Sequence, residues 1–186
     1  MINSEIIERA RRVKLLITDI DGVMTDGRIV YSIYGDELKF FDVTDGFGIS
    51  LLNRVGIRTV IITAKKTRIV KIRARDLKVA KAYAGYLDKN IPFNDVLKRF
   101  KIPAEEICFI GDDLMDVPVL KKVGLAVSVP NGMEEVKAVA HHITSKSGGR
   151  GAVRELCELI LKSQNKWDEA TSVSYTHLTL PTKRIV

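Results

Sequence analysis

The stretch that decides the fold reads KLLITDIDGVMTDG and runs from Lys14 to Gly27. It begins with the apolar run Leu15–Ile17, and a short apolar run that ends near a glycine is typical of a buried strand in a parallel sheet. Asp19 and Asp21 come at the end of that strand, and Gly22 turns the chain away from the sheet. Open α/β sheets bind their ligands in the crevice beyond the carboxyl ends of the strands. The two carboxylates are therefore candidate functional groups, although Asp and Gly are also ordinary turn residues.

The composition is that of a globular chain with one hydrophobic core. Its 186 residues are 46% hydrophobic and 28% charged, which suits a single domain. No apolar run approaches the roughly 20 residues of a membrane span, and residues 1–12 lack the apolar centre of a signal peptide, so we expect no membrane partner. The net charge is +7, but the basic residues are scattered, which favours anionic small molecules over nucleic acid. With only Cys108 and Cys157, a disulfide framework is not expected, and the reducing cytoplasm fits.

Strand and helix patterns alternate along the rest of the chain. Strands are expected at 15–19, 59–63, 80–84, 106–110, 125–129 and 142–143, and helices at 2–12, 44–55, 66–77, 92–101, 117–123, 133–140 and 153–164. This alternation predicts an α/β fold, a doubly wound, Rossmann-like and mostly parallel sheet with right-handed crossovers. We expect one domain over residues 1–170. Residues 171–186 show neither period and are interpreted as a non-native or disordered tail.

A β-hairpin is expected directly after the first strand, at residues 28–43. Its two arms, 28–34 and 37–43, are rich in β-branched and aromatic residues, and Gly35-Asp36 separates them. Apolar strands away from the main sheet leave a sticky edge unless something covers them. We therefore expect the chain to associate with itself through this inserted hairpin.

Polar residues follow four of the predicted strands at their carboxyl ends. They are Asp19 with Asp21, Thr63, Lys89 in the loop that begins at Gly85, and Asp112 with Asp113. The carboxyl ends of parallel strands meet at one edge of the sheet, so these groups are expected to converge. Carboxylates without nearby His or Cys suit Mg²⁺, while a lysine and a threonine hydroxyl suit a phosphoryl group. One carboxylate could attack phosphorus and another could transfer protons, so the pattern predicts phosphoryl transfer.

In this order, the motifs Asp-x-Asp-Gly, Thr, Lys and Gly-Asp-Asp-x-x-Asp resemble those of the haloacid-dehalogenase-like phosphohydrolases. The hairpin and the segments 43–48 and 148–155 are similar to one branch, the cap-less 3-deoxy-D-manno-octulosonate 8-phosphate phosphatases. The resemblance implies a Mg²⁺-dependent phosphomonoesterase that releases this sugar acid through an aspartyl phosphate, in the synthesis of lipopolysaccharide precursors. It also implies a homotetramer in which the hairpins join and a neighbouring subunit helps to close each active site.

The resemblance further implies a role for particular residues. Asp19 is the nucleophile, and Asp21 is the general acid and base and lends its backbone carbonyl to the metal ion. Asp112 is the third metal ligand, with Asp113 and Asp116 in support. The residues implied to hold the phosphoryl group or the sugar are Thr63, Lys89, Lys65, Arg73, Asp45 and Gly46.

One departure from the family pattern bears on the substrate. The family usually has Thr-Gly-Arg after the second strand, and this chain has Thr63-Ala64-Lys65. Lysine keeps the charge but cannot make the bidentate contact of arginine with a carboxylate, so the exact sugar acid stays open. The alternatives are a phosphatase of a related nine-carbon sugar acid phosphate, a phospho-receiver domain and an inactive binding domain. A receiver domain is disfavoured because its phosphorylated aspartate lies on a middle strand and no acid follows two residues later.

Overall fold

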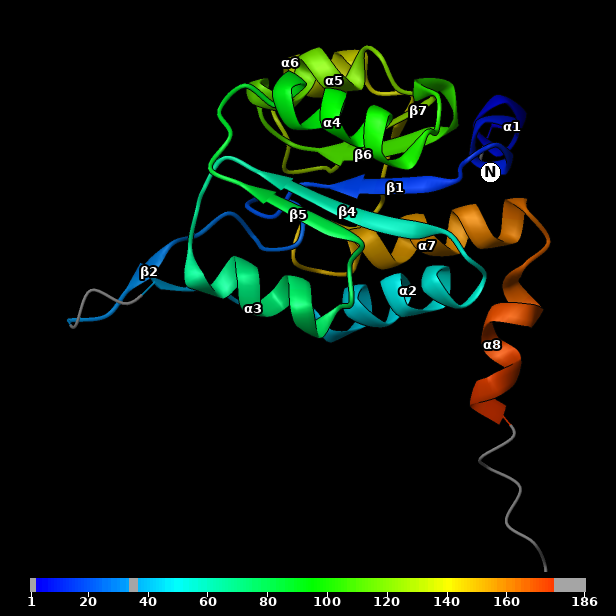
Figure 1. The fold of residues 1–186 in the computed structure, drawn as a ribbon, viewed down its shortest axis with the longest axis horizontal. Coiled ribbons are helices and arrows are strands. Elements are labelled where there is room, and N and C mark those ends of the chain that lie inside the picture. The colour runs from blue at the N-terminus through cyan, green and yellow to red at the C-terminus, as the bar shows by residue number, and fades with distance from the viewer. Residues whose placement is uncertain (1–2, 34–36, 176–186) are drawn as a thin grey trace, which may run out of the picture.

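A six-stranded parallel sheet organises the fold (Figure 1). The structure is a computed structural model that describes residues 3–33 and 37–175. The strands are β1 (Leu15–Thr18), β4 (Arg58–Thr63), β5 (Lys81–Ala84), β6 (Ile107–Gly111), β7 (Leu125–Ser128) and β8 (His142–Ile143). Their order across the sheet is β5-β4-β1-β6-β7-β8, and each neighbouring pair is parallel. The prediction of a doubly wound α/β fold is confirmed.

Helices cover both faces of the sheet (Figure 1). One face carries α2 (Val43–Arg54), α3 (Arg68–Asp76) and α7 (Ala152–Ser163), and the other carries α4 (Asn90–Phe100), α5 (Val117–Leu120) and α6 (Glu134–Val139). The remaining helices are α1 (Ser4–Arg11), which packs against α7, the short 3₁₀ turns η1 (Ala104–Glu106) and η2 (Leu114–Asp116), and α8 (Trp167–Tyr175). The chain leaves β1 toward β4 and later returns on the other side at β6. The switch point where such folds bind ligands is therefore at the carboxyl end of β1.

The central strand β1 is buried on both faces, as its apolar sequence predicts. Leu16 packs into the core beneath α2 and α7, while Leu15 and Ile17 pack into the core on the opposite face. Successive side chains of a strand point to opposite faces, so one short run contributes to both cores. Because β1 packs into the cores on both faces of the sheet, its position is well determined, and so is the position of the residues that follow it.

The capping residue of α2 differs from the predicted one. The sequence favours Thr44 or Asp45 as the cap, but the helix begins at Val43, and the Asp42 side chain accepts a hydrogen bond from the Thr44 backbone N–H. Asp, Thr and Ser can all cap a helix, so a run that contains several of them leaves the start uncertain by a residue or two. The shift releases Asp45 from the capping role and places it inside the first turn.

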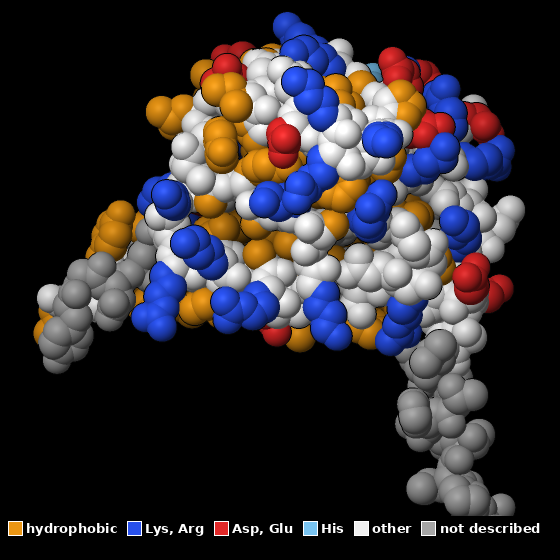
Figure 2. Space-filling model, viewed as in Figure 1, with side chains coloured by type: hydrophobic (Ala, Val, Ile, Leu, Met, Phe, Trp, Pro, Cys, Tyr) orange, Lys and Arg blue, Asp and Glu red, His pale blue; other side chains and the backbone are white. Residues whose placement is uncertain are grey.

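Outside the main sheet, β2 (Val30–Tyr31) and β3 (Glu37–Leu38) form a two-stranded antiparallel pair that extends away from the body (Figure 1). Both strands are shorter than the arms predicted for the hairpin, and its predicted turn at Gly35-Asp36 lies outside the described residues. Figure 2 shows hydrophobic side chains gathered on this extension. Ile33 is 94% exposed and Phe40 69% exposed, which is unusual for large apolar side chains in a single globular chain.

The carboxyl-terminal helix α8 extends through residues 171–175, which the sequence pattern assigns to the tail. Ala170 is fully buried in the core beneath α2 and α7, so the first part of this helix belongs to the folded body. The rest of the predicted tail, 176–186, lies outside the described residues. Within residues 3–33 and 37–175, every helix is too short or too polar to span a bilayer.

Candidate active site

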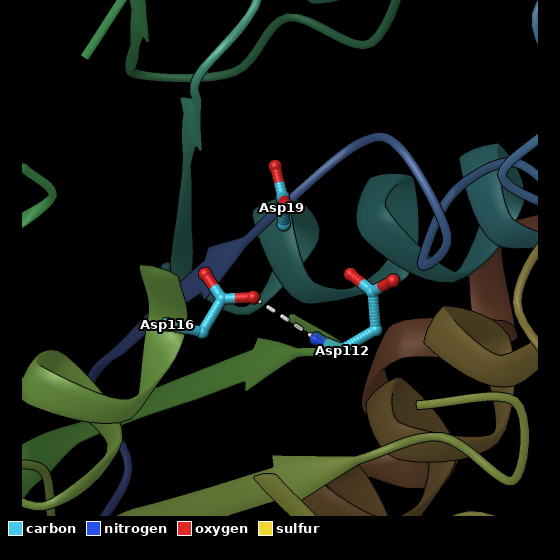
Figure 3. A group of neighbouring side chains, drawn as sticks. All are labelled: Asp19, Asp112 and Asp116. Atoms are coloured by element: carbon cyan, nitrogen blue, oxygen red, sulfur yellow. Dashed lines mark hydrogen bonds between the residues drawn. The ribbon is translucent and has the colours of Figure 1, made fainter. Parts of the chain in front are cut away.

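Three carboxylates meet at the carboxyl edge of the sheet (Figure 3). One oxygen from each of Asp19, Asp112 and Asp116 lies within 4.8 Å of the others. Asp19 directly follows β1 and Asp112 directly follows β6. These two strands pair in parallel with Thr18 opposite Ile110, so the two aspartates leave the sheet side by side. The predicted convergence of strand ends is confirmed for this pair, and the short turn η2 returns Asp116 to the same place.

A buried lysine lies among these carboxylates. The Nζ atom of Lys89 is 2.8 Å from Oδ2 of Asp19 and 2.5 Å from Oδ1 of Asp116, and the lysine side chain is inaccessible to solvent. Burial alone would lower the pKa of Lys89, but the attraction of the two carboxylates outweighs burial and raises it. Lys89 therefore remains an ammonium group and neutralises part of the negative charge of the cluster.

Asp116 supports the loop that carries Asp112. Its Oδ2 atom accepts hydrogen bonds from the backbone N–H groups of Asp112 and Asp113, at 3.0 and 3.2 Å. Since Lys89 occupies Oδ1, both carboxylate oxygens of Asp116 are already engaged. The side chain of Asp113 is exposed and caps η2 by accepting from the Leu114 N–H, and it is not one of the three carboxylates of the cluster.

The negative charge of the cluster exceeds what Lys89 can neutralise. Burial, followed by the repulsion of Asp19 and Asp116, raises the pKa of Asp112 to about 8. Burial also raises the pKa of Asp19 to about 6, although Lys89 opposes the shift. Within the described part of the chain, the buried Oδ1 atom of Asp112 has no hydrogen-bond partner. Asp112 therefore has an oxygen available to a hard divalent cation, and Asp19, whose two oxygens contact the Ile20 N–H and Lys89, lies beside it.

Gly22 allows the loop after β1 to close over Asp112. Its φ of +89° lies in the left-handed region, and a Cβ atom at this position would lie 1.9 Å from Oδ2 of Asp112. The glycine of the Asp-x-Asp-Gly motif is thus required both by backbone conformation and by space. Asp21 comes just before it, and its carboxylate forms an ion pair with Lys39 instead of joining the three-aspartate cluster.

A residue that no sequence motif marks, Asn131 in the loop after β7, holds the loop after β1 in place. The Asn131 side chain donates from Nδ2 to the Gly22 carbonyl at 2.8 Å, and its Oδ1 accepts from the Gly148 N–H at 2.7 Å. A Cβ atom at Gly148 would lie 1.8 Å from that same carbonyl oxygen. The signal in the sequence is weak, because Asn131 is one polar residue in the loop after β7. The late Gly148-Gly149 pair, by contrast, is explained by this close approach.

Of the other predicted site residues, Thr63 and Lys65 lie at the same edge of the sheet. Thr63 ends β4 and is 1% exposed, while Lys65 is partly buried two residues later. The strand β4 pairs with β1 so that Ile61 is opposite Thr18, which brings the end of β4 alongside the Asp19 loop.

Arg73, Asp45 and Gly46 form a separate group where α2, α3 and α7 meet. Arg73 donates to the Asp42 carbonyl at 3.2 Å, and a Cβ atom at Gly46 would lie 3.0 Å from its Nη2. Asp45 is fully buried and accepts from the Arg154 N–H at 2.8 Å, and burial raises its pKa to about 6. Across residues 3–33 and 37–175, no hydrogen bond or ion pair connects this group to the acidic cluster. Their predicted contact with substrate stays a prediction.

A doubly wound sheet that carries an aspartate, a buried lysine and carboxylates that could hold a cation at its switch point is typical of a site for phosphoryl transfer. The comparisons with known proteins agree with this class. A model of the haloacid dehalogenase-like hydrolases matches residues 56–156. The chain belongs to this family, and the resemblance noted from the motifs is confirmed.

Relatives and solved structures specify the branch of the family. The 3-deoxy-D-manno-octulosonate 8-phosphate phosphatase KdsC of Yersinia pestis is 41% identical over 173 residues, which cover 93% of this chain and 92% of the relative. The corresponding phosphatase of Moraxella catarrhalis, solved with magnesium, phosphate and 3-deoxy-D-manno-octulosonate, is 40% identical with a TM-score of 0.89, over 91% of this chain and 98% of the other. A probable YrbI-family phosphatase of Pseudomonas syringae is 39% identical with a TM-score of 0.90, over 93% and 98%. Membership of this family excludes the phospho-receiver alternative.

Proposed function

We propose that this chain is a Mg²⁺-dependent phosphatase that hydrolyses 3-deoxy-D-manno-octulosonate 8-phosphate to the free sugar acid and phosphate, in the cytoplasm, as a step in making lipopolysaccharide precursors. The observation that carries the proposal is the cluster of buried Asp19, partly buried Asp112 and buried Lys89 at the switch point of the sheet. The phosphatase of this substrate from Yersinia pestis is 41% identical over 93% of the chain, which supports the same substrate here.

In the first chemical step, a carboxylate oxygen of Asp19 attacks the phosphorus atom of the ester. The bond between phosphorus and the sugar oxygen breaks, and Asp21 donates a proton to that oxygen, which leaves as an alcohol. The product on the protein is an aspartyl phosphate. Lys89, which lies 2.8 Å from Asp19, would neutralise charge on the phosphoryl oxygens, and the buried Thr63 hydroxyl would donate to one of them.

In the second step, Asp21 takes a proton from a water molecule whose oxygen attacks the same phosphorus atom. The bond between phosphorus and Asp19 breaks, which releases inorganic phosphate and restores the aspartate. Phosphate monoesters hydrolyse so slowly in water that enhancements of about 10²¹-fold are known for enzymes that act on them. The rate gain is expected from the fixed position of the nucleophile and from charge neutralisation around phosphorus.

The residues present fit a magnesium ion. The carboxylates of Asp19 and Asp112, together with the backbone carbonyl of Asp21, would hold it. The buried Oδ1 atom of Asp112 has no hydrogen-bond partner and could therefore serve as a metal ligand. When bound, Mg²⁺ supplies positive charge to the phosphoryl oxygens. The solved phosphatase of Moraxella catarrhalis contains magnesium, which supports this assignment.

Stabilisation by Mg²⁺ should increase with pH. Burial raises the pKa of Asp19 to about 6 and that of Asp112 to about 8, above the ordinary value of 3.8, so these groups reduce stability progressively as the pH rises from the unfolded pKa through the folded pKa values. A cation binds their ionised forms, so it competes with protons below about pH 6 and not above about pH 8. At a hundredfold excess over Kd, we expect the melting temperature to rise by about 5–10 °C near pH 8.5 and by much less near pH 5.5.

This comparison is made by differential scanning fluorimetry with EDTA or MgCl₂ at both pH values. CaCl₂ controls for ionic strength and charge, because Mg²⁺ demands a tighter geometry than Ca²⁺. A thermal shift of equal size at both pH values would contradict the assignment of Asp19 and Asp112 as the ligands.

Space for a sugar acid is available beside the loop after β1. A cavity of about 430 Å³ lies there, with two arginines that could attract a carboxylate; it is lined by Asp26, Arg28, Phe40, Phe41, Asp42, Val43, Gly149 and Arg150. The substrate is tested by measuring phosphate release from a panel of phosphorylated sugar acids that includes eight-carbon and nine-carbon members. We expect the highest kcat/KM with 3-deoxy-D-manno-octulosonate 8-phosphate. A preference for a nine-carbon sugar acid phosphate would replace the proposed substrate and keep the reaction.

We also propose that the chain forms a homotetramer through β2 and β3. Large apolar side chains on this extension, including Tyr31, Ile33 and Phe40, are 65%, 94% and 69% exposed in the single chain. Burying them between subunits would remove this apolar surface from water, and it would also cover the edges of a two-stranded sheet.

Charge on this surface should prevent assembly. The double substitution Tyr31→Asp with Phe40→Asp places two carboxylates where an apolar contact is proposed, and we expect the mass in solution to fall from four chains to one, as measured by light scattering after gel filtration. Ile72→Asp is the matched control, because Ile72 is also an exposed apolar residue but lies on α3. An unchanged mass for the double variant would refute assembly through this surface.

A further inference from the structure

The side chain of Lys39 is buried, although lysine is ordinarily an exposed residue. Lys39 directly follows β3, and its side chain has no accessible surface, while its neighbours Leu38 and Phe40 are 47% and 69% exposed. Side chains alternate along an extended segment, so the orientation that turns two apolar residues outward turns the lysine inward. An ammonium group is costly to bury without a partner, so its position requires an explanation.

The carboxylate of Asp21 is one partner of Lys39. The lysine Nζ donates to Oδ1 of Asp21, which lies 18 residues earlier in the chain on the loop after β1. Among the described residues, no other hydrogen-bond donor contacts the Asp21 side chain. Asp21 does not join the cluster formed by Asp19, Asp112 and Asp116, although it lies two residues from Asp19. The orientation of Asp21 is therefore set by a residue of the β2–β3 extension.

We propose that Lys39 is a positioning residue for the reaction, and that it holds the Asp21 carboxyl group in the orientation from which it exchanges protons with the leaving oxygen and with water. The proposal rests on the proposed function, because it takes Asp21 as the general acid and base. A charge-assisted hydrogen bond is short and directional, so it restricts a side chain that is otherwise a quarter exposed and free to rotate. Because Lys39 belongs to the extension, the placement of the proton-transfer group depends on the placement of β3.

The leaving group of the substrate distinguishes this role from a structural one. An alkyl phosphate such as a sugar phosphate needs a proton on its leaving oxygen, whereas p-nitrophenyl phosphate releases a stable anion that needs none. The parameter kcat/KM reports the steps up to transfer of the phosphoryl group to Asp19. We expect Lys39→Met to lower kcat/KM about 100-fold for the sugar phosphate, since general acid catalysis contributes 10²- to 10⁴-fold, and less than about fivefold for p-nitrophenyl phosphate. Lys39→Arg, which keeps the charge and a donor, should recover most of the loss.

A double-mutant cycle with Asp21→Asn tests whether the two residues act together. If Lys39 acts through Asp21, then Lys39→Met should cause little further loss in the Asp21→Asn background. Lys137→Met is the control, because Lys137 is also ion-paired but lies on α6 with the exposed Glu134. Thermal unfolding of each variant is measured first. If Lys39→Met does not fold, Lys39→Gln takes its place, since it keeps a donor without the charge.

The outcomes separate this proposal from the proposed function. Equal losses with both esters, or additive effects in the cycle, would overturn the role of Lys39 even if the wild-type protein hydrolyses the proposed sugar phosphate. If the wild-type protein hydrolyses another alkyl phosphate instead, the proposed substrate fails, and the same comparison with that ester still tests Lys39. A selective loss with the alkyl ester and no further loss in the Asp21→Asn background supports the proposal.

Discussion

Asp19→Asn is expected to reduce phosphate release by at least about 10⁴-fold while leaving the fold intact, since loss of a covalent nucleophile has effects of this size. The amide of asparagine has the shape of the carboxylate but lacks its nucleophilic charge. Its Oδ1 atom can still accept the hydrogen bond that the Ile20 N–H donates to Asp19 at 2.7 Å. Lys89 keeps its contact with Asp116. We therefore expect this variant to lose activity while it keeps its fold.

The stability of Asp19→Asn provides the first check. Removal of one negative charge from a crowded cluster relieves repulsion on Asp112, and this gain offsets the lost ion pair with Lys89. We expect the free energy of unfolding in urea to change by no more than about 1 kcal/mol. Asp168→Asn, on the exposed surface of α8, is the matched control and should retain full activity. Retained turnover by Asp19→Asn would rule out Asp19 as the nucleophile.

The core of the site could be predicted because parallel strands impose a simple geometry. Asp19 and Asp112 follow β1 and β6, and the register of those two strands leaves no freedom in where the next residues lie. Lys89 follows β5 by a few residues and reaches the same edge. Residues at strand ends are thus placed by the sheet, and the periodicity of the sequence is enough to find the strands.

Residues that act through side-chain orientation could not be predicted in the same way. Lys39 lies in a short segment that has no core of its own, so periodicity does not say which face is inward. Asn131 acts by joining two loops that are distant in the sequence, and loop-to-loop packing leaves no periodic signal. The start of α2 was uncertain because several neighbouring residues can cap a helix.

For Arg73, the sequence predicts the helix on which the residue lies but not the contacts that its side chain makes. The sequence predicts a helix over 66–77 that contains Arg73, and α3 indeed follows β4 and its terminal Thr63. Its guanidinium, however, lies 4.9 Å from the Phe41 ring and donates to the Asp42 carbonyl. The helix brings Arg73 to the base of the β2–β3 extension, and a long flexible side chain then has several partners within reach.

Lys89→Met should cost both activity and stability, and the loss of stability should depend on pH. Methionine fills a similar volume but leaves the buried carboxylates of Asp19 and Asp116 without their cation. Breaking a buried ion pair by removing one partner typically costs about 3–5 kcal/mol, and loss of a charge that stabilises the transition state lowers kcat by about 10²- to 10³-fold.

The sign of the pH dependence follows from the carboxylates that Lys89→Met leaves unpaired. The pKa of Asp19 in the folded variant should lie further above the unfolded value, because Lys89 is what opposes the effect of burial on this carboxylate. Protonation at low pH removes the unpaired charge, so the deficit should be small near pH 4.5 and largest above about pH 8. Urea unfolding of both proteins in EDTA at these two pH values measures it, with Lys162→Met as a control at an exposed ion pair on α7. A deficit that does not change with pH would mean that lost packing, and not uncompensated charge, is what Lys89 contributes to the fold.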